Sequence, residues 1–241
     1  MDASVAQWLG KRESQQDAYA VKHYPQGTLA VVCDGMGGHA QGAGAARIAA
    51  DTFVAVFSDS ASMPMTERMQ LALDAANEAV GEMFAPSEYG GTTLVAVFAG
   101  AGVLWWISVG DSPLFLWRRK RLVRLNADHS MRAIYEEFVR SGTMTHAEAM
   151  NKGHMLRAAV TGERLDMVDI SVTPRPLIPG DRIILASDGV DALLLPPVLL
   201  DTTKAVLDNR EGSLAAHLVE ACRALQDPYA DNATVVTLDW K

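Results

Sequence analysis

Short apolar runs that end in glycine or aspartate alternate with longer stretches of helical periodicity along this chain. The run LAVVCD at 29–34 is aliphatic and β-branched, which predicts a strand. Two alanine-rich stretches, 42–57 and 66–84, place apolar residues at helical spacing and predict helices, with Thr66 as the N-cap of the second. The first third of the chain therefore predicts a strand followed by two helices.

The pattern changes after residue 90, where the apolar runs become short and closely spaced. Strands so close together are expected to pair antiparallel, because a parallel crossover needs about a dozen residues. Residues 130–165 are polar and irregular, with room for short helices. The remaining predicted elements are four strands within 91–127, strands at 166–173 and 181–188, a helix at 213–226 and a strand at 232–240.

This order of elements favours one class of fold. Helices grouped in blocks and framed by antiparallel strands favour an α+β protein over a doubly wound parallel sheet. Strands this apolar need cover on both faces, which two stacked sheets with helices outside would provide. We therefore expect a single domain over 1–241, a four-layer α-β-β-α sandwich with two central antiparallel sheets flanked by helices.

The composition restricts the classes of binding partner that we expect, and it says less about the fold. Hydrophobic residues make up 49% of the 241 residues, and 29 acidic against 21 basic side chains leave a net charge of −8. This charge argues against nucleic acid or an anionic membrane as a partner. No apolar run reaches the roughly 18 residues of a membrane span, and the N-terminus lacks a signal-peptide pattern. Two distant cysteines, Cys33 and Cys222, fit a reducing compartment, so we expect a cytoplasmic protein.

Aspartates at strand ends carry the chemical signal. Asp34, Asp111 and Asp188 each follow an apolar run, Asp231 precedes the last strand, and Asp17 leads into another apolar segment. A single aspartate of this kind is usually a turn residue or a helix cap. Several brought together would repel one another unless a cation lay between them. Ligands that are all oxygen favour Mg²⁺ or Mn²⁺ over zinc.

The stretch VVCDGMGGHAQG at 31–42 adds glycines directly after the first of these acids. Gly35 would let the backbone approach an ion and offer its carbonyl, while Gly37 and Gly38 keep the rim free of side chains. A glycine-rich turn entering a helix could instead cradle phosphate with backbone N–H groups, although no lysine follows at P-loop spacing. A tight turn with no further role is the remaining interpretation.

Taken in order, these motifs resemble a known family, the metal-dependent Ser/Thr protein phosphatases of the PPM or PP2C type. Met36, where animal members carry histidine, and the compact length resemble the bacterial branch. The resemblance covers most of the chain. The stretches that carry it are RESQQDA, VVCDGMGGHAQG, YGGTTLVAV, SVGDSPLFLW, NADHSM, LASDGVDAL and DNATVV.

The resemblance implies a two-metal site at one end of the sandwich. Asp34 would bridge the two Mn²⁺ or Mg²⁺ ions, and Asp188 and Asp231 would complete one ligand set. The Gly35 carbonyl would serve the other ion, and Asp17 would hold metal-bound waters nearby. A water shared by the two ions would attack the phosphorus of phosphoserine or phosphothreonine directly, so no covalent phosphoenzyme is expected.

Two further residues receive roles from the resemblance. Asp111 matches the acid that helps to hold a third, weaker metal in bacterial members, and Arg12 matches the phosphate-binding arginine. The partners implied are phosphoproteins and a bacterial Ser/Thr kinase whose action is opposed. We expect the protein to be a monomer. The segment SVGDSPLFLW also resembles members linked to control of type VI secretion.

Several positions depart from the family pattern. Met36 stands where the general-acid histidine lies, which leaves that role unassigned, and the nearby His39 is interpreted as a turn residue. Pro113 replaces an arginine after GDS, and Gln16 replaces an acid of eukaryotic members. His129 is interpreted as a structural residue bonded to a neighbouring loop.

Residues 130–165 fall where bacterial members carry a mobile flap. Gly142, Gly153 and Gly162 are its predicted hinges. Our hypothesis is that this flap shapes substrate choice and access to the weaker metal.

Two other functions are alternatives to a phosphatase. A non-catalytic relative that binds phosphoproteins would be expected to have lost metal-binding acids, which are all retained here. A two-metal nuclease would be expected to carry a basic, aromatic-rich stripe, which the net charge of −8 opposes.

Overall fold

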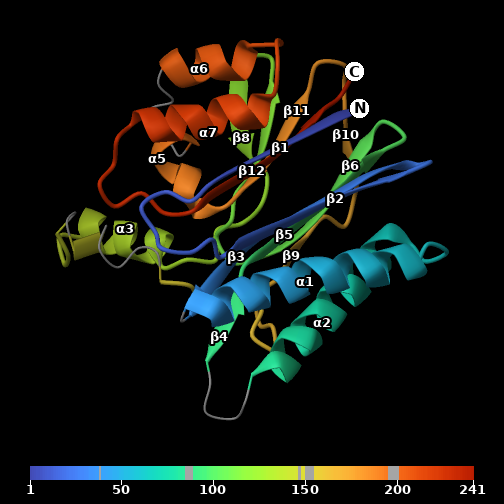
Figure 1. The fold of residues 1–241 in the computed structure, drawn as a ribbon, viewed down its shortest axis with the longest axis horizontal. Helices are drawn as coiled ribbons and strands as arrows, with labels where there is room; N and C mark the ends of the chain where they lie inside the picture. The colour runs from blue at the N-terminus through green and yellow to red at the C-terminus, as the bar shows by residue number, and fades with distance from the viewer. Residues whose placement is uncertain (38, 85–88, 146–147, 150–154, 195–200) are drawn as a thin grey trace.

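Two antiparallel sheets stack face to face, and helices cover the outer face of each (Figure 1). This computed structural model describes residues 1–37, 39–84, 89–145, 148–149, 155–194 and 201–241. Both termini lie together at the end of the sandwich opposite the start of the first helix (Figure 1). None of the helices in these ranges is long and apolar enough to cross a bilayer.

The five-stranded sheet carries the chain termini at one edge. In spatial order it consists of β1 (Asp2–Trp8), β12 (Ala233–Asp239), β11 (Arg182–Ala186), β7 (Leu114–Arg118) and β8 (Arg121–Arg124). Its outer face is covered by α5 (Asp191–Leu194), α6 (Asp201–Asp208) and α7 (Leu214–Ala224). The α7 helix begins with a capping bond, because Ser213 Oγ accepts from the Ala216 N–H at 3.1 Å.

The seven-stranded sheet forms the second layer. Its main path is β10 (Arg175–Pro176), β6 (Val103–Val109), β5 (Leu94–Gly100), β3 (Gly27–Gly37) and β2 (Asp17–Tyr24). Two short strands complete it, since β4 (Gly90–Thr92) pairs with β3 and β9 (Asp169–Ile170) pairs with β6. The helices α1 (His39–Asp59) and α2 (Met65–Met83) cover its outer face.

Alternation along the strands builds three apolar layers between these elements. In β3, Val31 and Cys33 pack toward α1 and α2, whereas Ala30 and Val32 pack between the two sheets. Because both faces of the strand are buried, its sequence is continuously apolar rather than alternating. The observed layers confirm the predicted α-β-β-α sandwich.

Both predicted helices of the first third are present, but one detail of the prediction was wrong. The observed α1 extends beyond 42–57 at both ends. The second helix begins at Met65, one residue before the expected cap Thr66. Pro64 takes the N-cap position without a side-chain hydrogen bond, because its fixed φ suits a helix start.

The expectation that neighbouring strands pair was correct twice and wrong once. The β5–β6 and β7–β8 pairs are antiparallel hairpins. Strands β6 and β7 fall in different sheets, because the chain crosses between the layers at Gly110, which has a φ of 99°. The predicted strand at 166–173 was also wrong, since only Asp169–Ile170 pairs there as β9. Strand β1 was not predicted, because its half-exposed sequence carries little apolar pattern.

Two short helical elements lie near the ends of the strands. The segment after β11 forms a single 3₁₀ turn, η1 (Asp188–Val190), which continues into α5. Within the polar region 130–165, α3 (Arg132–Arg140) supplies one of the expected short helices. Other parts of this region, residues 146–147 and 150–154, lie outside the described residues.

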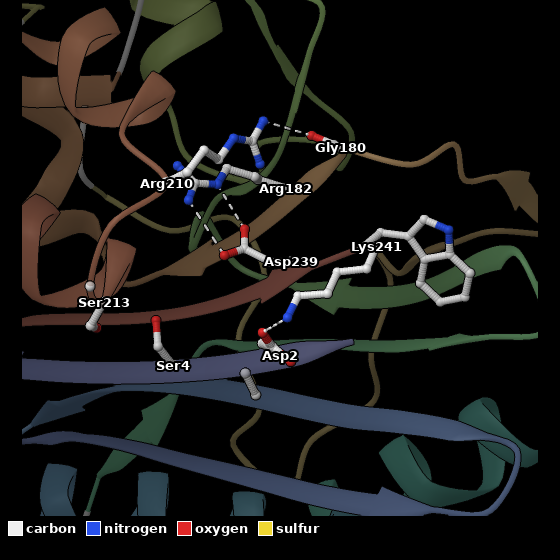
Figure 2. Close-up of a pocket in the computed structure, with 11 residues that line it drawn as sticks. Asp2, Ser4, Gly180, Arg182, Arg210, Ser213, Asp239 and Lys241 are labelled. Atoms are coloured by element: carbon white, nitrogen blue, oxygen red, sulfur yellow. Dashed lines mark hydrogen bonds and ion pairs between the residues drawn. The ribbon is translucent and has the colours of Figure 1, made fainter.

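A buried cation anchors the end of the five-stranded sheet that holds the termini. Arg182 is 1% exposed, and its Nε donates to Asp239 Oδ1 at 2.7 Å. Its Nη1 also donates to the carbonyls of Leu207 and Asn209. Figure 2 shows this pair in the wall of a cavity of about 740 Å³, where Lys241 pairs with Asp2 and Arg210 bonds to the Gly180 carbonyl. These bonds join β11 and β12 to the end of α6 and to the residue that follows it.

Candidate metal centre

The register of strands β2 and β3 brings the first two candidate acids together. Asp17 and Asp34 are direct partners across this antiparallel pair. The Gly35 N–H donates to the Gln16 carbonyl at 3.2 Å, which continues the pairing beyond them. Residues directly opposite each other in such a ladder place their Cβ atoms about 4.5–5.5 Å apart. The two carboxylates are therefore held side by side by backbone pairing alone.

A cavity of about 440 Å³ opens at the C-terminal ends of β3 and β11 and the N-terminal end of β12. Most of the acids predicted from the sequence line this cavity, together with the arginine that is predicted to bind phosphate. The lining residues that the sequence predicted are Arg12, Asp34, Gly35, Asp111, Asp188 and Asp231. Asp17 is not among the lining residues, because it is buried beneath this floor and is only 6% exposed. This cavity is at the opposite end of the five-stranded sheet from the larger cavity around Arg182.

Asp34 is fixed mainly through its backbone. Its N–H donates to Thr93 Oγ1 at 3.0 Å, and its carbonyl accepts from the Thr93 N–H at 2.9 Å. The Thr93 hydroxyl also bonds to the Ser112 hydroxyl at 2.6 Å. The Asp188 N–H reaches Asp34 Oδ2 at 3.5 Å. These bonds leave most of the carboxylate free to face the cavity.

Gly35 could not be replaced without moving the backbone around it. A Cβ at this position would lie 2.2 Å from the Gly42 carbonyl oxygen and 2.6 Å from the Gln16 carbonyl oxygen. Both neighbours are backbone atoms, which cannot rotate away. The close approach explains why glycine follows the aspartate, and it keeps the Gly35 backbone at the wall of the cavity.

Asp17 is half satisfied by two hydroxyl groups. Its Oδ2 accepts from Ser187 Oγ and from Thr234 Oγ1, both at 2.7 Å. Its Oδ1 is buried without a hydrogen-bond partner among the described residues. Burial raises the pKa of Asp17 to about 6, with the charges of Asp188 and Asp231 adding to the effect. The open oxygen and the raised pKa both indicate a group that would gain from a nearby cation or ordered water.

The raised pKa values of other acids in the cavity also indicate a site that would gain from a cation. Burial raises the pKa of Asp34 well above its ordinary value, and repulsion from Asp17, Asp188, Asp111 and Asp231 raises it further. Burial likewise raises the pKa of Asp111 to about 7, with Asp188 contributing. A cluster of carboxylates of this kind is costly unless positive charge compensates it.

The donor set fits hard divalent cations. Carboxylate and carbonyl oxygens line the cavity, without histidine or cysteine among its described lining residues, and this is the ligand chemistry of Mg²⁺ and Mn²⁺. Among the residues described, no three histidine, cysteine, aspartate or glutamate side chains are grouped tightly enough to ligate one ion by themselves. Such ions commonly keep several waters, so a site built from few protein ligands suits them.

Arg12 lies at the rim beside the last of the acids. Its Nη2 donates to Asp231 Oδ2 at 2.6 Å, and both side chains are partly exposed. The position follows from the loop after β1, where the Lys11 N–H donates to the Ala230 carbonyl at 2.8 Å. The structure thus brings Arg12, the predicted phosphate-binding residue, to the predicted metal site, where its guanidinium forms an ion pair with Asp231.

His129, the described histidine among the motifs, does not line the cavity. His129 is 3% exposed, and its Nδ1 accepts from the Gly110 N–H at 3.2 Å, which confirms the expected bond to a neighbouring loop. The side chain of His39 lies outside the described residues. Met36 lines the cavity at the position of the missing general acid, next to Met155 and Leu156.

The glycines predicted as hinges of residues 130–165 differ in how closely they are packed. Gly142 and Gly162 have positive φ values of 75° and 87°. A Cβ on Gly162 would lie 2.2 Å from the Gly81 Cα, so this glycine packs tightly against α2. Gly153 lies outside the described residues. A hinge role for these glycines stays a prediction.

Sequence reasoning overlooked the residues that hold the acids in place. Thr93, Ser187 and Thr234 support Asp34 and Asp17 through the bonds described above. Asn232 also accepts from the Gln16 N–H at 2.8 Å, which links the first and last motifs. All of these lie inside or beside the quoted motifs, so the small polar residues there were the available signal.

Comparison with known proteins identifies relatives of this arrangement. The family model described as protein phosphatase 2C matches residues 8–233. The serine/threonine protein phosphatase PstP of Mycobacterium tuberculosis is 31% identical over 222 residues. That alignment covers 90% of this chain but 41% of the relative, so the chain spans less than half of that protein.

Solved structures agree with the sequence comparison. The PPM Ser-Thr phosphatase MsPP from Mycobacterium smegmatis, in complex with cacodylate, superposes with a TM-score of 0.76 at 28% identity, covering 100% of this chain and 99% of that chain. The catalytic domain of PstP in complex with two manganese ions gives a TM-score of 0.75 at 27% identity, covering 99% and 97%.

Proposed function

Because the chain belongs to the protein phosphatase 2C family, we propose that it hydrolyses phosphoserine and phosphothreonine in proteins with the aid of divalent metal ions. The observation that carries this proposal is the common cavity. It gathers Arg12, Asp34, Gly35, Asp111 and Asp188 from distant parts of the chain, with Asp231 beside them. We assign the whole of 1–241 to one phosphatase domain.

The proposed metal ligands are the acids and the backbone of this cavity. Asp34, Asp188, Asp231 and the Gly35 carbonyl would hold the two ions. When bound, Mn²⁺ or Mg²⁺ ions lower the pKa of a bound water, and their positive charge stabilises the phosphoryl oxygens. Asp17 would hold ordered water through its free oxygen, and Asp111 would assist a third, weaker ion.

The chain's own groups would do the remaining work. Arg12 is at the rim, where its guanidinium can donate two hydrogen bonds to phosphoryl oxygens and orient the phosphorus. No serine or cysteine is among the described residues that line the cavity, and the hydroxyl of Thr93 is bonded to the Asp34 N–H and to Ser112. Water is therefore the proposed nucleophile. Met36 cannot donate a proton, so the leaving alkoxide would take its proton from water in the open cavity.

The proposed substrates are phosphoproteins made by a bacterial Ser/Thr kinase. The support is the similarity to bacterial Ser/Thr phosphatases. We propose that the chain acts as a monomer, since a single chain supplies all of the candidate ligands that line the cavity. The links to type VI secretion and to flap-controlled substrate choice stay predictions.

A phosphate-release assay on a phosphothreonine peptide tests the proposal. We expect release by the wild type with Mn²⁺ and none with a chelator. Asp188→Asn should abolish it, whereas Asp74→Asn, a matched change on the exposed surface of α2, should leave it unchanged. Absence of release from folded wild type with Mn²⁺ would refute the enzyme and leave a phosphoprotein-binding module.

A further inference from the structure

A ladder of ion pairs connects two of the candidate ligand segments, those that carry Asp111 and Asp188. It begins at Arg124, whose Nη2 donates to the Asp111 carbonyl at 2.7 Å and whose Nη1 pairs with Asp128 at 3.0 Å. Asp128 also lies 3.9 Å from Arg132 Nη1. Arg132 Nη2 then donates to Asp191 Oδ2 at 2.6 Å.

The far end of this ladder holds the turn that carries Asp188. The Asp191 N–H donates to the Asp188 carbonyl and closes the 3₁₀ turn η1. Asp191 is largely buried, and its second oxygen has no hydrogen-bond partner among the residues described. The orientation of Asp191 therefore depends on Arg132, and the turn around Asp188 depends on Asp191.

The ladder joins parts of the chain that backbone pairing does not join. Arg132 is the first residue of α3, and Asp191 is the first residue of α5. No strand pairing connects these helices, and α3 stands apart from the sheets (Figure 1). The Arg132–Asp191 bond is thus the described polar contact that ties α3 to the segment after β11.

We propose that Arg132 is a positioning residue that, through Asp191, holds Asp188 in place for divalent-ion binding. The inference rests on the proposed function, because it assumes that Asp188 is a metal ligand. Groups that orient metal ligands typically contribute about 10–100-fold to metal affinity. Arg132 also carries a positive charge near the carboxylates, and a charge alone would repel cations.

These two effects predict opposite results for the same variants, which makes them separable. If Arg132 acts only through its charge, Arg132→Gln should tighten Mn²⁺ binding and Asp191→Asn should weaken it. If the pair positions Asp188, both variants should weaken binding, by about tenfold. The double variant separates them again, because its net charge equals that of the wild type. Positioning predicts that its binding stays weak, whereas charge alone predicts a return to the wild-type value.

Isothermal titration of the full chain with Mn²⁺ provides the measurement. Arg140→Gln is the matched control, since this arginine on the same helix is exposed and pairs with the exposed Glu137. The Mn²⁺ affinity of this variant should stay within about twofold of wild type. Arg132→Lys keeps the charge and one hydrogen bond, so its affinity should fall between wild type and Arg132→Gln. Urea unfolding confirms that each variant is folded.

The outcomes separate the inference from the proposed function. Opposite shifts in the two single variants, or no shift in either, would overturn the positioning role while wild type still binds Mn²⁺ and releases phosphate. Failure of the wild type itself to bind Mn²⁺ would overturn the proposed metal site, and the positioning role with it.

Discussion

Asp17 and Asp34 stand directly opposite each other across strands β2 and β3, although one is buried and the other faces the cavity. The pairing places two carboxylates close together, and the charge of Asp17 raises the pKa of Asp34. Asp17 is costly to bury without a metal, because hydroxyl groups from Thr234 in β12 and from Ser187 after β11 satisfy only one of its oxygens.

Asp17→Asn should therefore stabilise the metal-free protein while weakening its metal site. Removing a buried charge beside Asp34 relieves repulsion, and we expect a gain of about 1 kcal/mol in the free energy of unfolding with a chelator present. Mn²⁺ affinity should fall by about tenfold or more. Urea unfolding and calorimetric titration check the two effects, and a loss of stability together with unchanged affinity would contradict this interpretation.

Gly35→Ala should damage the site through the backbone. The added Cβ would meet two carbonyl oxygens, so we expect a loss of about 1–3 kcal/mol in the free energy of unfolding and a marked fall in phosphate release. Gly44→Ala in α1 is the matched control. Its Cβ would meet only the flexible end of Met83, so a neutral effect or a small gain is expected. Equal effects of the two substitutions would argue against a special role for Gly35.

Arg182→Met should be among the most destabilising single substitutions at the terminal end of the sandwich. It leaves Asp239 and the carbonyls of Leu207 and Asn209 without their cation, at a cost of about 3–5 kcal/mol. Arg210→Met, in the same cavity, removes an exposed bond to Gly180 and should change stability by less than about 0.5 kcal/mol (Figure 2). Urea unfolding of both variants is the measurement, and similar midpoints would contradict the expectation.

His129 should make the protein sensitive to acid. Burial lowers the pKa of His129 in the folded state, where its neutral Nδ1 accepts from Gly110. In the unfolded chain the imidazole takes up a proton near pH 6.5, so the unfolded state binds more protons below that pH. The stability linked to His129 is therefore present above about pH 6.5 and is lost as the pH falls below it.

The measurement is the free energy of unfolding at several pH values between 7.5 and 5. His129→Gln retains an acceptor for Gly110 but cannot be protonated, so the wild type should lose stability relative to this variant as the pH falls over this interval. The raised pKa values of Asp17 and Asp111 act in the opposite direction in both proteins and cancel from the difference. A difference that does not change with pH would contradict the role of His129.

Much of the site was readable from the sequence because the signal is local. Each acid follows or precedes a buried strand, and a strand end is a rigid place that the apolar pattern reveals. The two sheets and their helical cover also followed from the sequence, because continuous apolar strands require cover on both faces. Gly35 was identified from the same motif as a glycine that lets the backbone approach an ion, whereas its close packing against the Gly42 and Gln16 carbonyls came from the structure.

Only the tertiary structure decided how these pieces meet. The crossing between sheets at Gly110 has no periodic signal, and the closeness of β6 and β7 along the chain suggested a pairing that does not form. The same holds for the Arg132–Asp191 bond, which joins residues 59 positions apart. Apolar pattern determines which faces are buried, because burial acts on each segment separately. Long-range polar contacts depend on how whole layers stack, and that is settled by packing of the complete chain.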